Sequence, residues 1–152
     1  MFFDNKYRQL MNSDEERLID RCLPWTYMWN AQVEIDKHII NNKDKFVIKP
    51  VMGSSGENVT LGWKTTESEW MEVLQNISNK GENYIIQERV KSAIIEVPKI
   101  QGSKMKIINN WGFYIFNDEF GGILNRYLDI QCHDEIISGL RAAGFASVFI
   151  KR

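Results

Sequence analysis

The stretch that most constrains the fold is a β-rich run over residues 45–51 (KFVIKPV), which ends abruptly at residues 52–56 (MGSSG). Branched and aromatic residues favour extended backbone, whereas clustered glycine and serine favour a turn. Residues 58–63 then resume a strand-like pattern. The two segments therefore predict a β-hairpin whose tip is the glycine-serine loop.

The clearest helix of the chain begins at Thr66. Thr66 and Glu69 form a capping box, in which each side chain can satisfy a backbone amide of the other residue. Gly81 lies where a C-terminal cap belongs. Between these ends, apolar residues recur at helical spacing and form one stripe, which consists of Trp70, Val73, Leu74 and Ile77.

Other helices are predicted from weaker patterns. Ser13 and Glu16 match a second capping box, which predicts a helix over residues 13–21 that stops before the following proline. Residues 33–40 carry isoleucines and a valine with weak helical spacing, and residues 134–143 precede a glycine that could end a helix.

The second half of the chain is mostly β in pattern. The expected strands are 84–88, 93–97 and 145–150, together with a hairpin of 105–116 and 122–128 that turns at Asn117-Asp118. The aromatic-rich residues 24–29 are expected to form a connection packed on the domain. Strands and helices mix without a regular βαβ alternation, which predicts an α+β fold with a mainly antiparallel sheet and flanking helices.

Composition excludes several classes of protein. With 152 residues, the chain fits one domain or one compact piece of a larger one. A hydrophobic fraction of 43% is too high for a disordered chain. The net charge of −1 provides no general attraction to nucleic acid or to an anionic membrane, so neither is expected as a partner.

The cysteines, the histidines and the apolar runs indicate a cytoplasmic chain without a zinc site. Cys22 and Cys132 lie far apart and are expected to be reduced thiols. No apolar run approaches the roughly 18 residues that cross a bilayer, and the N-terminus lacks the apolar core of a signal peptide. His38 and His133 have no partners at ligand spacing.

Lys49 is the first candidate for chemistry. It ends an apolar strand and shares a face with Val47, so its side chain could point toward the interior. A buried ammonium group is costly unless an anion meets it, and phosphate is a natural partner for lysine. The alternative is an edge-strand lysine whose amine reaches water. The residue by itself leaves both interpretations open.

Two further segments could assist Lys49. The loop that contains Gly53, Ser54, Ser55 and Gly56 offers backbone amides and hydroxyls to an anion. Gln87-Glu88 closes a strand and could accept hydrogen bonds from an adenine amino group or from ribose hydroxyls. Taken singly, the loop is also typical of an ordinary turn, and the Gln-Glu pair of a solvated strand end.

The order of these pieces resembles the nucleotide-binding half of the ATP-grasp fold. It is most similar to the circularly permuted branch, which includes glutathionylspermidine synthetase-like carboxylate–amine ligases. The matching stretches are FVIKP (46–50), GSSGENVTLG (53–62), EW (69–70) and YIIQERV (84–90), with LPWT (23–26) and GILNR (122–126) as weaker additions.

The resemblance implies an organisation for the chain. It would be a single ATP-grasp-like domain or fragment with three parts. Residues 1–44 would form a helical lead-in. Residues 45–103 would carry the lysine strand, the glycine loop and the Gln-Glu strand, and residues 104–152 the hairpin, a helix and the final strand.

The resemblance also implies roles for the candidate residues. Lys49 would contact an ATP phosphate, and the loop of residues 53–56 would fold over the phosphates. Gln87, Glu88 and their backbone would hold adenine and ribose, while Arg126 would neutralise an acyl phosphate or the transferred phosphoryl group. The implied cofactors are ATP and Mg²⁺. The implied partners are a nucleotide and small-molecule or peptide carboxylate and amine substrates.

The sequence departs from the family pattern in the loop and in the metal ligands. Ser55 stands at a glycine position, Glu57 at the lysine position and Asn58 at another glycine position. Family members commonly place a glutamate two residues before an asparagine for Mg²⁺, but Ile123 precedes Asn125 here. We therefore assign no metal ligand in this chain.

Three functional hypotheses follow. The chain is the nucleotide-binding part of an ATP-dependent ligase and is inactive alone, or it is a degenerate ATP-grasp-like module that binds a partner without using ATP. The third hypothesis is a small α+β interaction domain outside this family. The loop carboxylate and the missing metal ligands favour the second.

Overall fold

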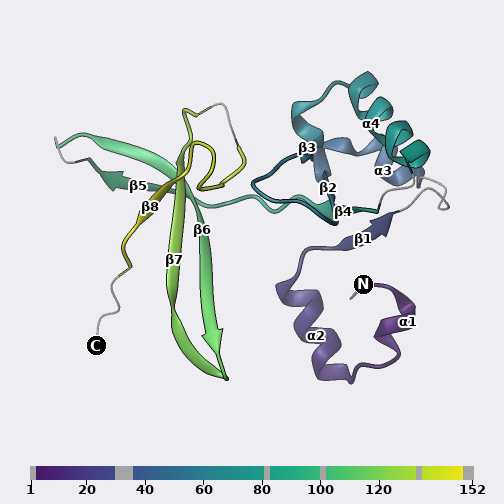
Figure 1. Cartoon of the computed structure of the whole chain (residues 1–152), viewed down its shortest axis with the longest axis horizontal. Coiled ribbons are helices and arrows are strands. Elements are labelled where there is room, and N and C mark those ends of the chain that lie inside the picture. The colour runs from purple at the N-terminus through teal and green to yellow at the C-terminus, as the bar shows by residue number, and fades with distance from the viewer. Residues whose placement is uncertain (1–2, 30–35, 81–82, 100–101, 133–134, 149–152) are drawn as a thin grey trace. The chain divides into compact units, whose positions relative to one another are not determined.

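The computed structural model describes residues 3–29, 36–80, 83–99, 102–132 and 135–148. The chain divides into two compact units, Met1–Val90 and Lys91–Arg152, and each contains one four-stranded antiparallel sheet (Figure 1). The prediction of an α+β fold with mainly antiparallel sheet is therefore confirmed. That the two units form one ATP-grasp-like domain stays a prediction.

The first unit is built on a sheet with strand order β1-β4-β2-β3. Its strands are β1 (Thr26–Trp29), β2 (Phe46–Pro50), β3 (Thr60–Leu61) and β4 (Tyr84–Glu88). Its helices are α1 (Asn5–Arg8), α2 (Ser13–Cys22), α3 (Lys37–Asn41) and α4 (Glu67–Lys80), with 3₁₀ turns η1 (Lys43–Lys45) and η2 (Gly62–Lys64).

The core of the first unit lies on one face of this sheet, where α4 packs its predicted apolar stripe. Large side chains of α4, of α3 and of three strands are buried together, and each contributes about 1.5–3 kcal/mol when it is removed from water. The buried cluster consists of Trp29, Ile39, Phe46, Ile48, Trp70, Leu74, Ile77, Tyr84 and Ile86, with Val73 packed against it.

Helix α4 begins with the predicted capping box. The backbone amide of Glu69 donates to Thr66 Oγ1 at 3.2 Å, and the amide of Thr66 donates to Glu69 Oε2 at 2.7 Å. These hydrogen bonds from Thr66 stabilise the charged form and hold the pKa of Glu69 below its usual value. The predicted C-terminal cap, Gly81, lies outside the described residues.

The hairpin of β2 and β3 is also confirmed, with Val47 opposite Leu61. Strand β3 has two residues and passes at once into η2, so it is shorter than expected. The reason is a close backbone approach at Gly62, where a Cβ atom would lie 1.9 Å from the carbonyl oxygen of Lys43. Glycine is required at this crossing because any side chain would meet backbone atoms.

The start of α2 differs from the prediction by one residue. Asn12, not Ser13, is the N-cap: its Oδ1 accepts from the amides of Asp14 and Glu15 at 2.9 and 3.0 Å. The amide of Asn12 donates in return to Glu15 Oε2 at 2.9 Å. Asparagine caps helices as well as serine does, and Glu15 stands at the third helical position that the box requires.

Residues 24–29 were expected to form a connection, but four of them form strand β1. This strand pairs antiparallel with β4 and places Trp29 in the core. Its threonine and aromatic side chains suit a half-buried sheet surface. Helix α3 is also shorter than the segment 33–40, because it begins after the N-cap Asp36; residues 33 and 35 lie outside the described residues.

The second unit has strand order β5-β6-β7-β8. These strands are β5 (Ile94–Pro98), β6 (Lys104–Phe116), β7 (Glu119–Asp129) and β8 (Gly144–Ala146). The predicted hairpin is confirmed as β6 and β7. Asn117 and Asp118 both have positive φ, 50° and 63°, as a type I′ turn requires.

The helix predicted at 134–143 is wrong: the described residues 135–143 form turns and irregular backbone. Gly139 lies in its middle, which weakens a helix, and a Cβ there would lie 2.5 Å from the ring of Phe145. Glycine at this position instead allows the backbone to pack against the ring of Phe145. The final strand, β8, is also shorter than predicted.

None of the helices in the described part of the chain has the length and apolarity needed to cross a membrane.

Candidate functional site

Lys49 lies near the end of β2, on the sheet face opposite the core. Phe46 and Ile48 are buried on one face, while Val47 and Lys49 are part-buried on the other. The predicted shared face with Val47 is therefore present, but it is not the core face. Burial still covers much of the lysine, and this loss of water lowers its pKa.

Gln87 of β4 is the partner of this lysine. Lys49 Nζ donates to Gln87 Oε1 at 2.8 Å, across a part-buried surface. The structure thus brings together two of the site residues that the sequence suggested. An amide is neutral, and no ion pair of Lys49 with a carboxylate is found among the described residues. The lysine charge is therefore hydrogen-bonded but not neutralised.

A third residue, Thr26 of β1, completes this arrangement. Gln87 Nε2 donates to Thr26 Oγ1 at 2.7 Å, and the Thr26 hydroxyl donates to the carbonyl oxygen of Pro24 at 2.9 Å. Thr26 and Gln87 are direct cross-strand partners. Sequence reasoning assigned Thr26 no role because residues 24–29 were expected to be a connection, although the segment LPWT belongs to the resemblance.

The glycine-serine loop begins four residues after Lys49. Ser55 and Gly56 have positive φ, 60° and 77°, and Asn58 has φ of 55°. The amide of Glu57 donates to the carbonyl oxygen of Ser54 at 3.0 Å, which closes a tight turn. Gly53 and Ser54 are exposed, as is Glu57. The loop therefore exposes the Glu57 carboxylate to solvent, together with Gly53 and Ser54.

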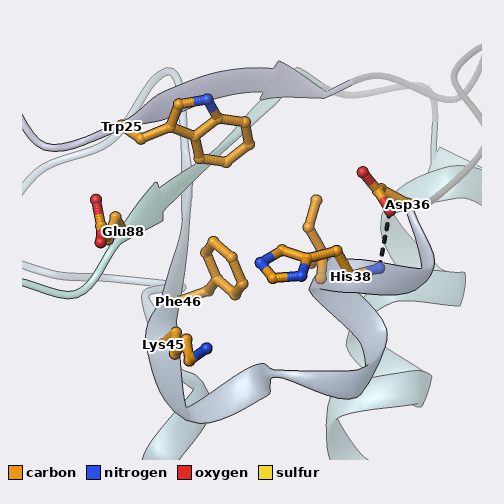
Figure 2. A pocket seen from close by; sticks show the side chains of 7 residues that line it. Trp25, Asp36, His38, Lys45, Phe46 and Glu88 are labelled. Atoms are coloured by element: carbon orange, nitrogen blue, oxygen red, sulfur yellow. Dashed lines mark hydrogen bonds between the residues drawn. The ribbon is translucent and has the colours of Figure 1, made fainter. Parts of the chain in front are cut away.

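Glu88 lies on the opposite face of the sheet from Gln87. Neighbouring residues of a strand point to opposite faces, and Glu88 is paired with the core residue Phe46. Figure 2 shows the cavity that it lines, about 410 Å³ in volume, to which α3, β2 and β4 contribute together with the segment just before β1. The other lining residues are Trp25, Asp36, His38, Ile39 and Lys45.

Aromatic edges form the floor and wall of this cavity. The ring of Phe46 meets those of Trp25 and His38 edge-on, at centroid distances of 6.1 and 5.8 Å. The amide of His38 is held by the carboxylate of Asp36 at 2.8 Å (Figure 2). Gln87 and Glu88, which the sequence suggested as a pair, thus serve two different surfaces through their side chains.

Arg126 belongs to the second unit, on β7. Its Nη2 donates to Asn110 Oδ1 at 2.8 Å across the β6–β7 pair. Its Nε is buried and has no hydrogen-bond partner among the described residues, and the same holds for Nδ2 of the buried Asn125. The arginine is therefore anchored through one nitrogen on its sheet.

The described residues provide no group of three histidine, cysteine, aspartate or glutamate side chains that could hold a metal ion. Because Mg²⁺ at nucleotide sites is held by one or two carboxylates together with phosphate oxygens and water, we assign no ligand to it and route no step of the chemistry through a metal.

Comparison with known proteins identifies the family of the chain. A family model described as circularly permuted ATP-grasp type 2 matches residues 11–108. The match includes Lys49, the glycine-serine loop and Gln87-Glu88, whereas Arg126 lies beyond it. A search of curated proteins found no match.

Among solved structures, the chain is similar to the D-alanine–D-alanine ligase of Bacillus anthracis at 12% identity and a TM-score of 0.35. That similarity covers 73% of this chain and 38% of the ligase. The family match, by contrast, spans more than half of the 152 residues. The chain belongs to the circularly permuted ATP-grasp type 2 family.

Proposed function

We propose that the chain is the nucleotide-binding part of an ATP-dependent carboxylate–amine ligase. The observation that carries the proposal is Lys49: its part-buried ammonium is held by the neutral amide of Gln87 at 2.8 Å in a chain of the ATP-grasp family. An ammonium that has lost water and has no carboxylate partner gains most from an incoming anion.

The chemistry of such a ligase suits these residues. In the first step a carboxylate oxygen attacks the γ-phosphorus of ATP, forming an acyl phosphate and releasing ADP. In the second step an amine attacks the acyl carbon, releasing phosphate and a proton and leaving an amide. Phosphoryl transfer depends mainly on positioning and charge stabilisation. In this chain, Lys49 would bind a phosphate, and the loop of residues 53–56 would cover the phosphates.

Other roles are extensions of the same proposal. Gln87 and the main chain of Gln87 and Glu88 hold adenine and ribose, because the Glu88 side chain lies on the other sheet face. Arg126 stabilises the acyl phosphate or the transferred group. The chain spans only 38% of the ligase to which it is structurally similar. Because the sequence lacks the metal ligands of the family pattern, we expect nucleotide binding without turnover from this chain alone.

Glu57 favours a second candidate, a family member that binds a partner without using ATP. Its carboxylate is exposed in the loop that would close on the triphosphate, and its negative charge would repel the phosphates. Family membership excludes the third hypothesis, an α+β domain from outside the family.

Calorimetric titration with ATP, with and without Mg²⁺, tests the proposal. Wild-type protein should bind, and Lys49→Met should weaken binding by about tenfold or more, the effect of one charge-assisted hydrogen bond. Gln87→Glu should weaken it too, because the new carboxylate would neutralise Lys49. Lys6→Met, which changes an exposed lysine of α1 outside the residues that the family model matches, is the control and should leave affinity unchanged.

Two results would contradict the proposal. If wild-type protein shows no binding at millimolar ATP, the second candidate replaces it. If Lys49→Met and Lys6→Met bind ATP equally, the phosphate site lies elsewhere.

A further inference from the structure

We propose that Thr26 is a positioning residue for the phosphate site: its hydroxyl fixes the orientation of the Gln87 amide and thereby the position of the Lys49 ammonium. The consequence for nucleotide binding rests on the proposed function. The hydrogen-bond chain itself involves residues of this unit alone and can be tested without nucleotide.

Each hydrogen bond in the chain sets the direction of the next. The carbonyl oxygen of Pro24 can only accept, so the Thr26 hydroxyl must donate its single hydrogen there, at 2.9 Å. The hydroxyl oxygen is then left with lone pairs, which can only accept. The group of Gln87 that meets it at 2.7 Å must therefore be the NH₂ end of the amide.

The same reasoning sets the other end of the amide. With its NH₂ group on Thr26, Gln87 directs its oxygen at Lys49 Nζ, 2.8 Å away. A reversed amide would direct NH₂ at an ammonium, and two donors would face each other. Thr26 therefore decides whether Lys49 meets an acceptor or a repelling donor.

The surroundings make this orientation important. Antiparallel register places Thr26, Gln87, Val47 and Leu61 in one row across the sheet. The next row on the same face contains Met28, Ile85 and Lys49. None of the row neighbours of Lys49 carries a charge. Without a charged neighbour, the amide oxygen is the polar group that holds the ammonium when no nucleotide is bound.

Thr26→Val keeps the shape of the side chain and removes its hydroxyl, whereas Thr26→Ser keeps the hydroxyl. Thr26→Val should lower the pKa of Lys49, because the ammonium loses an oriented acceptor that favours its charged form. Nucleotide affinity should fall by roughly fivefold, and its alkaline limit should move to lower pH. Thr26→Ser should match the wild type in all three measurements.

The pKa of Lys49 is measured from its ¹³Cε resonance during a pH titration of the whole chain without nucleotide. The resonance is assigned by its absence in Lys49→Met. Thermal unfolding of both Thr26 variants shows how much of any change comes from weakened β1–β4 pairing. A purely structural role for Thr26 would lower stability without shifting the Lys49 titration.

The outcomes separate this inference from the proposed function. If the Lys49 pKa is the same in Thr26→Val and Thr26→Ser, the positioning role is wrong, whatever the affinity for ATP. If the pKa falls in Thr26→Val while wild-type protein binds no ATP, the hydrogen-bond chain is correct and the proposed function is wrong.

Discussion

The two units each contain a four-stranded antiparallel sheet, but they bury very different amounts of apolar surface. In the first unit, α4 covers one sheet face and nine large side chains are buried together. In the second unit, the buried hydrophobic residues among those described are Ile107 and Leu128. The described residues of this unit contain no helix.

Exposed aromatic residues mark the second sheet. They gather on the part of the β6–β7 hairpin that extends beyond the pairing with β5 and β8: Phe113, Tyr114, Phe116 and Phe120. A sheet packed on a helix is stabilised by removal of apolar surface from water. A two-stranded ribbon relies on backbone pairing, its turn and cross-strand side-chain contacts.

Truncation of one large apolar side chain in each unit should show the greatest contrast. Leu74→Ala in α4 removes a fully buried side chain and should lower the free energy of unfolding by about 3 kcal/mol. Phe113→Ala, at a residue that is 63% exposed, should cost less than about 1 kcal/mol. Urea denaturation of the full chain measures both, and equal losses would show that the ribbon is as well packed as the core.

The cap of α4 should give a smaller effect, specific to the first unit. Thr66→Ala should lower the free energy of unfolding by about 1 kcal/mol, because the amide of Glu69 loses its acceptor. Ser68→Ala, in the same exposed turn, is the control and should cost less. Thermal unfolding of both variants measures the difference.

The same cap predicts a pH dependence. Because the folded-state pKa of Glu69 is lowered, its carboxylate stabilises the fold above its unfolded pKa, and this contribution is lost as pH falls through the folded pKa. The Tm difference between wild type and Glu69→Gln should therefore shrink at acid pH. A constant difference would contradict the hydrogen-bonded cap.

The turn of the second unit should give the smallest effect. Asp118→Gly should stabilise the protein by about 0.5 kcal/mol, because Asn-Gly is the preferred pair for a type I′ turn. Asp118→Val should destabilise it, since a β-branched residue is strained at positive φ. Urea denaturation compares the two variants; equal stability would mean that this turn does not limit the hairpin.

Much of the fold could be predicted because the signals are local. The strand that ends at Lys49-Pro50, the helix after Thr66 and the turn at Asn117-Asp118 each carry their own propensity, cap or turn residues. The failures have tertiary causes. Residues 26–29 became a strand because β4 offered a free edge, and the segment around Gly139 lost its helix to packing against Phe145.

The candidate site divides in the same way. Sequence order and residue type pointed to Lys49 and Gln87 and to the family. Alternation along the predicted strand 84–88 already implied that Gln87 and Glu88 point to opposite faces, although the sequence reasoning treated them as a pair. Sequence could not show that Thr26, 61 residues earlier, fixes the Gln87 amide.

By itself, then, the sequence determined the α+β class, the hairpins, the amphipathic helix and membership of the ATP-grasp family, because side-chain period, caps and turn residues act over a few neighbouring positions. The tertiary structure decided which sheet face carries Lys49 and which residues hold it. Those outcomes depend on the register of three strands, and register is set by burial of one sheet face against a helix.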